Sequence, residues 1–564
     1  MASRLPRHGL SALAALLLGC GGTTATGLAG PSPVETLPPA PMATPVERAW
    51  HGGTVYFLLL DRFANGDPTN DDALGRARDA APGRGFEGGD LKGVLQRLEA
   101  GWFDSLGVTA IWMTPFVEQV RGPVDEGTGK TYGFHGYWAR DWTAVDPAFG
   151  TGDDLRAVVD AAHRRGIRVL MDAVINHTGP ATATDPAWPA DWVRTSPTCT
   201  YTTYLTTTAC TLVANLPDVL TERDTPAALP PFLVDKWRAE GRLERERAEL
   251  ETFFARTGFP RTPRHHLIKW LTDWVRRYGI DGYRMDTAKH FGEGVSAELF
   301  AEARRAFDAW KAANPGKAVD GLGFLTLGEV YGWAPQGGRA YDFGDRRVDY
   351  FAHGYQALIN FAFKADTARL DDVFTRYALL ARGGLGGGLF LNYLASHDDG
   401  APFDRRRQDP MGTGTRLLLA PGGAQVYYGD ELARPLEVPG ATGDANLRGA
   451  MNWGDLALPR TRIILEHWRK LGRFRRAHPA VGAGEHRRHQ AQPYIFSRQV
   501  TVDARTDRVL IALDQPEGAK VVPVFGVFPD GTTLEDAYSG ATGTVRGGVI
   551  RLPSGASTVL LAPR

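Results

Sequence analysis

Two carboxylates, with basic residues close to one of them, are the part of this sequence best suited to chemistry. The segment Gly282–His290 reads Gly-Tyr-Arg-Met-Asp-Thr-Ala-Lys-His and closes a short apolar run. In a strand, Arg284 and Asp286 project to the same side, so the guanidinium would keep the carboxylate ionised and oriented. A second carboxylate, Glu329, ends another apolar run. Such a pair suits acid–base or nucleophilic catalysis on a polar substrate.

The elements that must position these residues alternate between strand-like and helical patterns. After residue 50, apolar runs end in polar residues at 54–60, 109–113, 168–171, 324–328, 389–394 and 425–428. Helical patterns lie between most of them, such as Asp153 to Arg165, which Gly166 ends. This alternation predicts an α/β fold with a parallel sheet, and so many units indicate a (β/α)8 TIM barrel. In such a barrel, polar residues at the C-terminal ends of strands are candidates for catalysis.

Two regions depart from this alternation. Residues 178–264 are rich in Pro, Thr and Asp, and we interpret them as a domain inserted after the third barrel strand. From 479 to 564, short apolar runs separated by Gly-rich turns predict a C-terminal antiparallel β-sandwich. The barrel is therefore expected to comprise residues 49–177 and 265–478.

The N-terminus has the pattern of a targeting segment. Basic residues precede a short apolar run, Leu10 to Leu18, which is too short to span a bilayer as a mature helix. The run continues into Gly19-Cys20 and resembles the bacterial lipobox, in which the Cys becomes lipidated. We predict a signal peptide over 1–19, a lipid on Cys20 and a flexible tether over 20–48. The alternative is an ordinary secretory signal with a chance Cys. The lipid would make the protein a cell-envelope lipoprotein, and in a Gram-negative host Gly21 favours the outer membrane.

The cysteine count bears on the predicted disulfide and on the predicted lipid. The chain has 3 Cys, and Cys199 and Cys210 are close enough in sequence to close a small disulfide loop in an exported protein. Cys20 is then the one left for the lipid.

The net charge bears on the partners of the protein. Lys plus Arg equal Asp plus Glu at 64 each, so the zero net charge argues against a nucleic-acid partner. We expect a monomer.

Four motifs in order resemble the α-amylase superfamily, family 13 of the glycoside hydrolases, over roughly residues 50 to 480. They are Asp172–His177, Gly282–His290, Leu327–Val330 and Ser396–Asp398. Further matching stretches are Tyr132–Trp138, Leu216–Val219 and Pro421–Glu431. The resemblance implies retaining hydrolysis of α-1,4-glucosidic bonds in starch, glycogen or maltooligosaccharides, which needs two carboxyl groups.

The resemblance also implies roles for individual residues. Asp286 would be the nucleophile and Glu329 the general acid and then base. Asp398 would bind the 2- and 3-hydroxyls of the distorted sugar, and Asp172 would support the site. Substrate contacts are implied for Tyr137, His177, Arg284, Lys289, His290 and His397. Ser396 stands where the family often has Asn, so we expect altered hydrogen bonding near Asp398 and not lost activity.

Calcium is the cofactor that the resemblance implies, because its ligands are carboxylate, amide and carbonyl oxygens. Asn176, Asp218 and the carbonyl of His290 match the family's usual calcium site. A second site resembles the N-terminal loop of cyclodextrin glucanotransferases and comprises Asn65, Asp67, Asn70, Asp71, Gly88 and Asp90. A solvated turn is the alternative for that Asn- and Asp-rich stretch.

Two other functions stay open. Within the family, the protein could be a glucanotransferase, neopullulanase or α-glucosidase. Lys289-His290 differs from typical α-glucosidases, and Val330 stands where cyclodextrin glucanotransferases usually have Trp. Outside catalysis, the chain could be an envelope lipoprotein that only binds glycans, although inactive members of the superfamily typically lose catalytic carboxylates.

Overall fold

The computed structural model describes residues 40–125, 127–553 and 557–564. The predicted signal peptide, Cys20 and most of the predicted tether lie outside these residues. The tether prediction is wrong at its C-terminal end, because helix α1 (Pro45–Trp50) begins inside it. Thr44 and Glu47 form a reciprocal capping box there, which satisfies two backbone N–H groups at the helix start. Residues 41 and 43 also hydrogen-bond to the backbone of Thr501.

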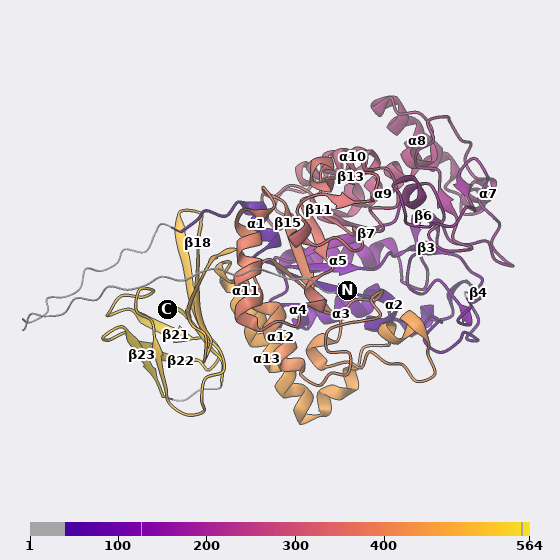
Figure 1. The fold of residues 1–564 in the computed structure, drawn as a ribbon. Helices are drawn as coiled ribbons and strands as arrows, with labels where there is room; N and C mark the ends of the chain where they lie inside the picture. The colour runs from indigo at the N-terminus through magenta and orange to yellow at the C-terminus, as the bar shows by residue number, and fades with distance from the viewer. Residues whose placement is uncertain (1–39, 126, 554–556) are drawn as a thin grey trace, which may run out of the picture. The chain divides into compact units, whose positions relative to one another are not determined.

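Eight parallel strands form the closed barrel that the sequence predicts (Figure 1). In chain order they are β1 (Thr54–Leu58), β2 (Ala110–Met113), β7 (Arg168–Ala173), β10 (Gly282–Met285), β11 (Leu325–Gly328), β14 (Ala357–Asn360), β15 (Leu389–Tyr393) and β16 (Gly423–Tyr427). Strand β16 pairs with β1 and closes the ring. The sequence patterns located seven of these strands and missed β14, whose apolar run is only Ala-Leu-Ile and which pairs with β11 at two positions.

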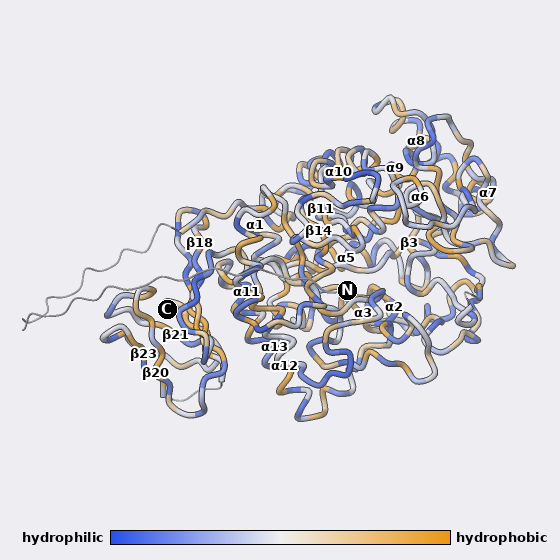
Figure 2. The backbone as a smooth tube through the Cα atoms, viewed as in Figure 1, coloured by the Kyte–Doolittle hydropathy of each residue, from blue (hydrophilic) through white to orange (hydrophobic). Residues whose placement is uncertain are grey.

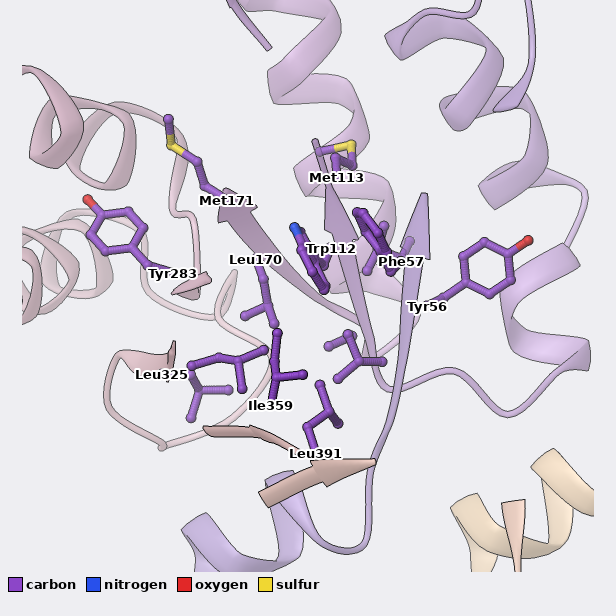
Figure 3. Packing of buried hydrophobic residues seen from close by; sticks show 14 of the residues in the cluster. Tyr56, Phe57, Trp112, Met113, Leu170, Met171, Tyr283, Leu325, Ile359 and Leu391 are labelled. Carbon is purple, nitrogen blue, oxygen red and sulfur yellow. The ribbon is translucent and has the colours of Figure 1, made fainter. Parts of the chain in front are cut away.

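The barrel interior is packed with side chains and is not a pore. Figure 3 shows Leu170, Ile359 and Leu391 converging inside the ring, while Tyr56 and Tyr283 point outward. This is the alternation that strand geometry requires. Every residue of β1, β10, β11, β14 and β15 is buried, because helices cover the outer face.

Helices follow most of the strands and pack on the outside of the barrel. The longer ones are α3 (Leu91–Glu99), α5 (Gly152–Arg164), α9 (Pro263–Tyr278), α10 (Glu293–Ala313), α11 (Leu370–Leu379), α12 (Pro410–Leu418) and α13 (Pro459–Ala477). Thr151 caps α5 with a capping box. Gly279, at φ 78°, ends α9 directly before β10, where a Cβ would lie 2.2 Å from the Trp310 ring. No helix in the described part of the chain is long and apolar enough to cross a membrane.

The region after β7 contains short strands, helices and a disulfide. Its elements are β8 (Val193–Arg194), α6 (Leu205–Thr208), β9 (Asp218–Val219), α7 (Pro231–Ala239) and α8 (Leu243–Thr257). Cys199 and Cys210 form the predicted disulfide. The tryptophans of this region pack on those of the barrel, with Trp192 stacked on Trp270 at 5.8 Å between ring centroids. Aromatic packing thus holds the insertion against α9.

The C-terminal region is antiparallel, as predicted. A six-stranded sheet has the order β17 (Glu485–Gln490), β18 (Ile495–Val502), β19 (Arg505–Ala512), β24 (Val559–Pro563), β21 (Thr533–Asp536) and β22 (Ala541–Thr544). Strands β20 (Lys520–Pro523) and β23 (Val549–Leu552) form a second sheet. Side chains of both sheets, such as Leu510, Val522 and Ile550, share one apolar core. Burial increases along β19 toward its C-terminal end, and Figure 2 shows that both hydrophilic and hydrophobic residues occur in the backbone of this region, where β18, β20, β21 and β23 are labelled.

Candidate active site

Arg284 joins the acidic residues at the C-terminal end of the barrel. It lies on β10, opposite Asp172 of β7 and Leu327 of β11 in the register of the sheet. Its Nη1 lies 2.8 Å from Asp172 Oδ1 and 2.7 Å from Asp286 Oδ1, and its Nη2 lies 2.7 Å from Glu329 Oε2. A single guanidinium, 1% exposed, therefore fixes three carboxyl groups from neighbouring strands.

Glu329 follows the last residue of β11 and is nearly buried, at 7% exposure. Besides Arg284, it accepts a hydrogen bond of 2.9 Å from the backbone N–H of Thr287. Burial raises the pKa of Glu329 from 4.5 to about 8, helped by the charges of Asp286 and Asp398 and opposed by Arg284. Glu329 therefore carries its proton at neutral pH. This is the state that a general acid needs.

Asp286 directly follows β10 and has one oxygen without a partner. Its Oδ1 is held by Arg284, while its buried Oδ2 has no hydrogen-bond partner among the described residues. The next residue, Thr287, has φ 46°, which is unusual for a β-branched residue. This backbone turn presents the N–H of Thr287 to Glu329 and so couples the two carboxylate positions.

Asp398 lies at the pocket wall, with 39% of its side chain exposed. Its Oδ1 is 2.7 Å from Arg448 Nη2, and its Oδ2 is 2.8 Å from His397 Nε2. The partial loss of water around Asp398 in the pocket favours the neutral form, but the attraction of His397 and Arg448 outweighs it, so the pKa of Asp398 lies well below its usual value. The site therefore contains one protonated and one ionised carboxyl group whose environments differ.

Aromatic and imidazole rings line the pocket next to Asp398. The Tyr137 ring stacks on His397 at 5.3 Å between centroids, with planes 11° apart. The Tyr137 hydroxyl donates to Asp172 Oδ2 at 2.8 Å, and the Trp112 indole donates to the same oxygen at 2.9 Å. His177 Nε2 lies 3.1 Å from the Tyr137 carbonyl oxygen. Asp172 is thus occupied by Arg284, Tyr137 and Trp112, which suits a supporting residue.

Lys289 and His290 contact a different set of residues from those around Asp398. The Lys289 ammonium donates to the carbonyl oxygen of Tyr331 at 3.0 Å and to the hydroxyl of Tyr341 at 3.1 Å. His290 Nδ1 lies 3.3 Å from the carbonyl oxygen of Thr207 in the disulfide loop. Burial and then the Lys289 charge lower the pKa of His290 to about 3, so its ring stays neutral.

These side chains surround one pocket of about 580 Å³. Its lining includes every residue for which a substrate or catalytic role is predicted except Arg284 and His397, which line a smaller cavity that shares Glu329 and Asp398 with it. No role was predicted for the rest of the lining. Four of these residues, His135, Trp138, Leu216 and Thr287, lie in the matching motifs and stretches, whereas none of the others was named from the sequence, and these are Tyr201, Leu212, Tyr331, Asp444 and Arg448. Arg448 has the clearest role among these, because it also pairs with Asp444 at 2.9 Å. It ends a 3-10 helix, Gly443–Arg448, beyond the last barrel strand, so no strand or motif pattern marks it.

Asn176 and Asp218 come together as the first calcium prediction requires. The Val219 N–H donates to the Asn176 carbonyl oxygen at 2.8 Å. Both amide atoms of the buried Asn176 side chain lack a hydrogen-bond partner among the described residues. Burial raises the pKa of Asp218 to about 8, although Arg194 lies 2.8 Å away and opposes this. A buried, poorly satisfied carboxyl and amide pair fits an oxygen-ligated cation.

The N-terminal loop gives a mixed fit to the second calcium prediction. Asn70 Oδ1 is buried without a partner in the described structure, and Asn65 and Asp71 face the bare Cα of Gly88. However, Lys92 Nζ lies 2.5 Å from Asp67, and Asp90 accepts the N–H groups of residues 66, 67 and 93. An ammonium group therefore neutralises one of the proposed ligands. No cluster of three or more His, Cys, Asp or Glu side chains that could hold a metal occurs in the described part.

The fold and the comparison with known proteins together define a class, the glycoside hydrolases. A family model described as the alpha-amylase catalytic domain matches residues 57–435. The chain therefore belongs to the alpha-amylase family.

Individual relatives agree with this assignment. The periplasmic alpha-amylase of Escherichia coli (strain K12) is 36% identical over 495 residues, which cover 77% of this chain and 68% of that protein. A cyclomaltodextrin glucanotransferase of Geobacillus stearothermophilus is 26% identical over 509 residues, which cover 85% of this chain and 62% of that protein. The solved alpha-amylase of Geobacillus thermoleovorans, complexed with acarbose, is 22% identical and superposes with a TM-score of 0.63 over 92% of this chain and 99% of that one. The last similarity shows a shared fold.

Proposed function

We propose that the protein is an α-amylase that hydrolyses α-1,4-glucosidic bonds within starch, glycogen and maltooligosaccharides, with retention of configuration. The observation that carries this proposal is the contact of Arg284 with both Asp286 and Glu329. One guanidinium holds a carboxylate with a free oxygen beside a carboxyl group that keeps its proton. An oxygen free to attack and a proton available to the leaving group are what a retaining glycosidase requires of its two carboxyl groups.

The two carboxyl groups would act in sequence. Asp286 Oδ2 attacks the anomeric carbon while Glu329 gives its proton to the glycosidic oxygen, so the leaving chain departs as an alcohol. Glu329, now ionised, takes a proton from water, and that water displaces Asp286 from the sugar. The ionised Asp398, held by Arg448 and His397, would accept hydrogen bonds from hydroxyls of the same sugar. Tyr137 and His177 would contact that sugar from the neighbouring pocket wall.

Product analysis tests this function against its alternatives. Purified protein is incubated with starch and with maltoheptaose, and the products are separated over time. Short linear maltooligosaccharides support an α-amylase, while cyclic or lengthened products would make the protein a glucanotransferase. Val330 already distinguishes it from the usual glucanotransferase pattern. Binding without any cleavage would favour the glycan-binding lipoprotein and overturn the proposal.

Calcium at Asn176 and Asp218 would act structurally. Asn176 is adjacent to His177 of the pocket, and Asp218 belongs to the inserted region, so a shared cation would tie that region to the barrel. The carbonyl of His290 is the third proposed ligand. Bound cation would stabilise the folded state by mass action. For the N-terminal loop we propose weaker binding, because calcium there would have to displace Lys92 from Asp67.

The site of action proposed is the cell envelope. The similarity to a periplasmic relative supports export. The Leu17–Cys20 pattern supports a lipid on Cys20, with the enzyme anchored to the outer membrane by its N-terminal tether. The catalytic region would then act on α-glucans at the membrane surface.

A further inference from the structure

The segment that carries Asp398 is irregular, and the residue after it is a second, buried carboxylate. Residues 394–401 follow β15 without helix or strand. Within this turn, Asp399 is 4% exposed, whereas Asp398 faces the pocket. A buried carboxylate is costly unless it is paired and hydrogen-bonded. The two-carboxyl mechanism does not use Asp399, so its burial needs another explanation.

Two side chains from the barrel hold Asp399, one on each oxygen. The Lys364 ammonium donates to Asp399 Oδ1, and the Tyr393 hydroxyl donates to Asp399 Oδ2 at 2.6 Å. Lys364 belongs to the short helix Phe363–Ala365 after β14, and Tyr393 is the last residue of β15. Lys364 and Asp399 expose only 15% and 6% of their side chains, so salt screens this ion pair little.

The two donors are themselves fixed by neighbouring strands. Asn360, the last residue of β14, pairs in register with Asn392 of β15, and its side-chain amide donates to Asn392 Oδ1 at 2.8 Å. Asn360 Oδ1 also accepts the N–H of residue 362 at 3.1 Å, which starts the turn toward Lys364. The Tyr393 ring meets the Phe361 ring edge-on, at 5.7 Å between centroids. Both donors therefore stand on rigid parts of the barrel.

Asp399 passes this fixed position to Asp398 through a single peptide bond. The hydrogen bond inside the turn is long, because the Asp398 N–H lies 3.4 Å from the Ser396 hydroxyl oxygen. A rotation of the backbone there would move the Asp398 carboxylate, and the buried Asp399 anchor opposes it. Asp398 and Asp399 also line the same small cavity as Glu329, the proton donor. The anchor thus sets where Asp398 lies relative to the reacting groups.

We propose that Lys364 is a positioning residue for hydrolysis, which acts through Asp399 to hold the turn that places the Asp398 carboxylate against the sugar. Tyr393 is the second donor of the same anchor. This inference rests on the proposed function, in which Asp398 binds hydroxyls of the distorted sugar. An interaction that strengthens in the transition state affects kcat, whereas uniform binding affects KM. Loss of the anchor should therefore lower kcat and leave KM nearly unchanged.

The test begins with Lys364→Met in the full chain, with maltoheptaose as substrate. The variant removes the ammonium and keeps a side chain of similar length. Its kcat should fall about tenfold or more, since a displacement of about 1 Å in a positioned group can cost about a hundredfold. Lys364→Arg retains a charged donor and should restore most of the lost kcat. Lys317→Met is the matched control, because 52% of the Lys317 side chain is exposed and it lines neither cavity.

A double-mutant cycle separates positioning from general structural support. In the Asp398→Asn background the carboxylate is already lost, so adding Lys364→Met should cost much less than it does in the wild type. The good leaving group of 4-nitrophenyl α-maltotrioside serves to measure the residual activity of these variants. Equal losses in both backgrounds overturn the inference, and so does an unchanged kcat in Lys364→Met.

Melting temperatures show whether each variant folds. If Lys364→Met does not fold, Tyr393→Phe decides, because it removes one hydroxyl of the anchor and keeps the ring. Its kcat should then fall while KM stays nearly constant, and an unchanged kcat overturns the inference. Failure of the wild type to cleave maltoheptaose would instead refute the proposed function.

Discussion

Replacing Glu329 by Gln should abolish hydrolysis and, above neutral pH, stabilise the fold. In the folded protein the pKa of Glu329 is raised to about 8, while an unfolded chain ionises it near 4.5. Between these values the folded state holds a proton that the unfolded state has lost, so the wild type's free energy of unfolding falls as pH rises. At about 1.4 kcal/mol per pKa unit, the loss accumulates to about 5 kcal/mol by pH 8. The Gln side chain is neutral at every pH, so the Glu329→Gln variant does not lose this stability as pH rises.

Thermal unfolding of both proteins at pH 4.5, 6 and 8 measures this effect. The melting temperature of Glu329→Gln should rise relative to the wild type as pH increases, with the largest difference at and above pH 8. Glu244→Gln serves as the control, because its side chain is 87% exposed and should leave the pH dependence unchanged. Parallel curves for wild type and Glu329→Gln would refute the reasoning, since Glu329 would then ionise normally in the fold. In the same range, kcat/KM of the wild type should decline above about pH 8 as the acid loses its proton.

Three further predictions address the nucleophile, the metal and the lipid. Asp286→Asn should remove hydrolysis with little change in melting temperature. Proton NMR of the wild-type reaction should show the α-anomer as the first product, and a β-anomer would exclude the double displacement. Chelation should lower both the melting temperature and the activity. The loss of stability is about 2.7 kcal/mol if calcium was at a hundredfold excess over its dissociation constant, and Asp218→Ala should have the same effect. Unchanged melting temperature and activity after verified metal removal would make Asn176 and Asp218 ordinary polar residues. Because the pKa of Asp218 is about 8, calcium affinity should increase from pH 6 to pH 8. Cys20→Ala should release the protein from membranes or block its processing, and a wild type recovered in soluble form after cleavage elsewhere would contradict the anchor.

Parts of the site could be predicted because they depend on short segments of sequence. Arg284 and Asp286 are two residues apart at the end of a strand, so strand geometry alone places them together. Asp172 and Glu329 lie at the C-terminal ends of β7 and β11, the two strands on either side of β10, and parallel strands bring their C-terminal ends to one edge. The disulfide followed from two cysteines close in sequence. The end of the tether was misjudged because a six-residue helix with one apolar anchor, Trp50, has too little periodicity to stand out.

The sequence by itself determined the barrel, seven of its eight strands and the carboxylates at their ends, because strand and helix periodicities and adjacent polar residues are local properties. Only the tertiary structure decided which environment each carboxyl group meets. Glu329 keeps its proton because the fold buries it, whereas Asp398 stays ionised because its neighbour His397 and Arg448, 50 residues further along the chain, both contact it. Likewise, Tyr201 and Tyr331 flank Lys289 only after the disulfide loop has packed on the barrel. Burial, charge pairing and ring contacts depend on residues far apart in the chain, and no local pattern encodes those distances.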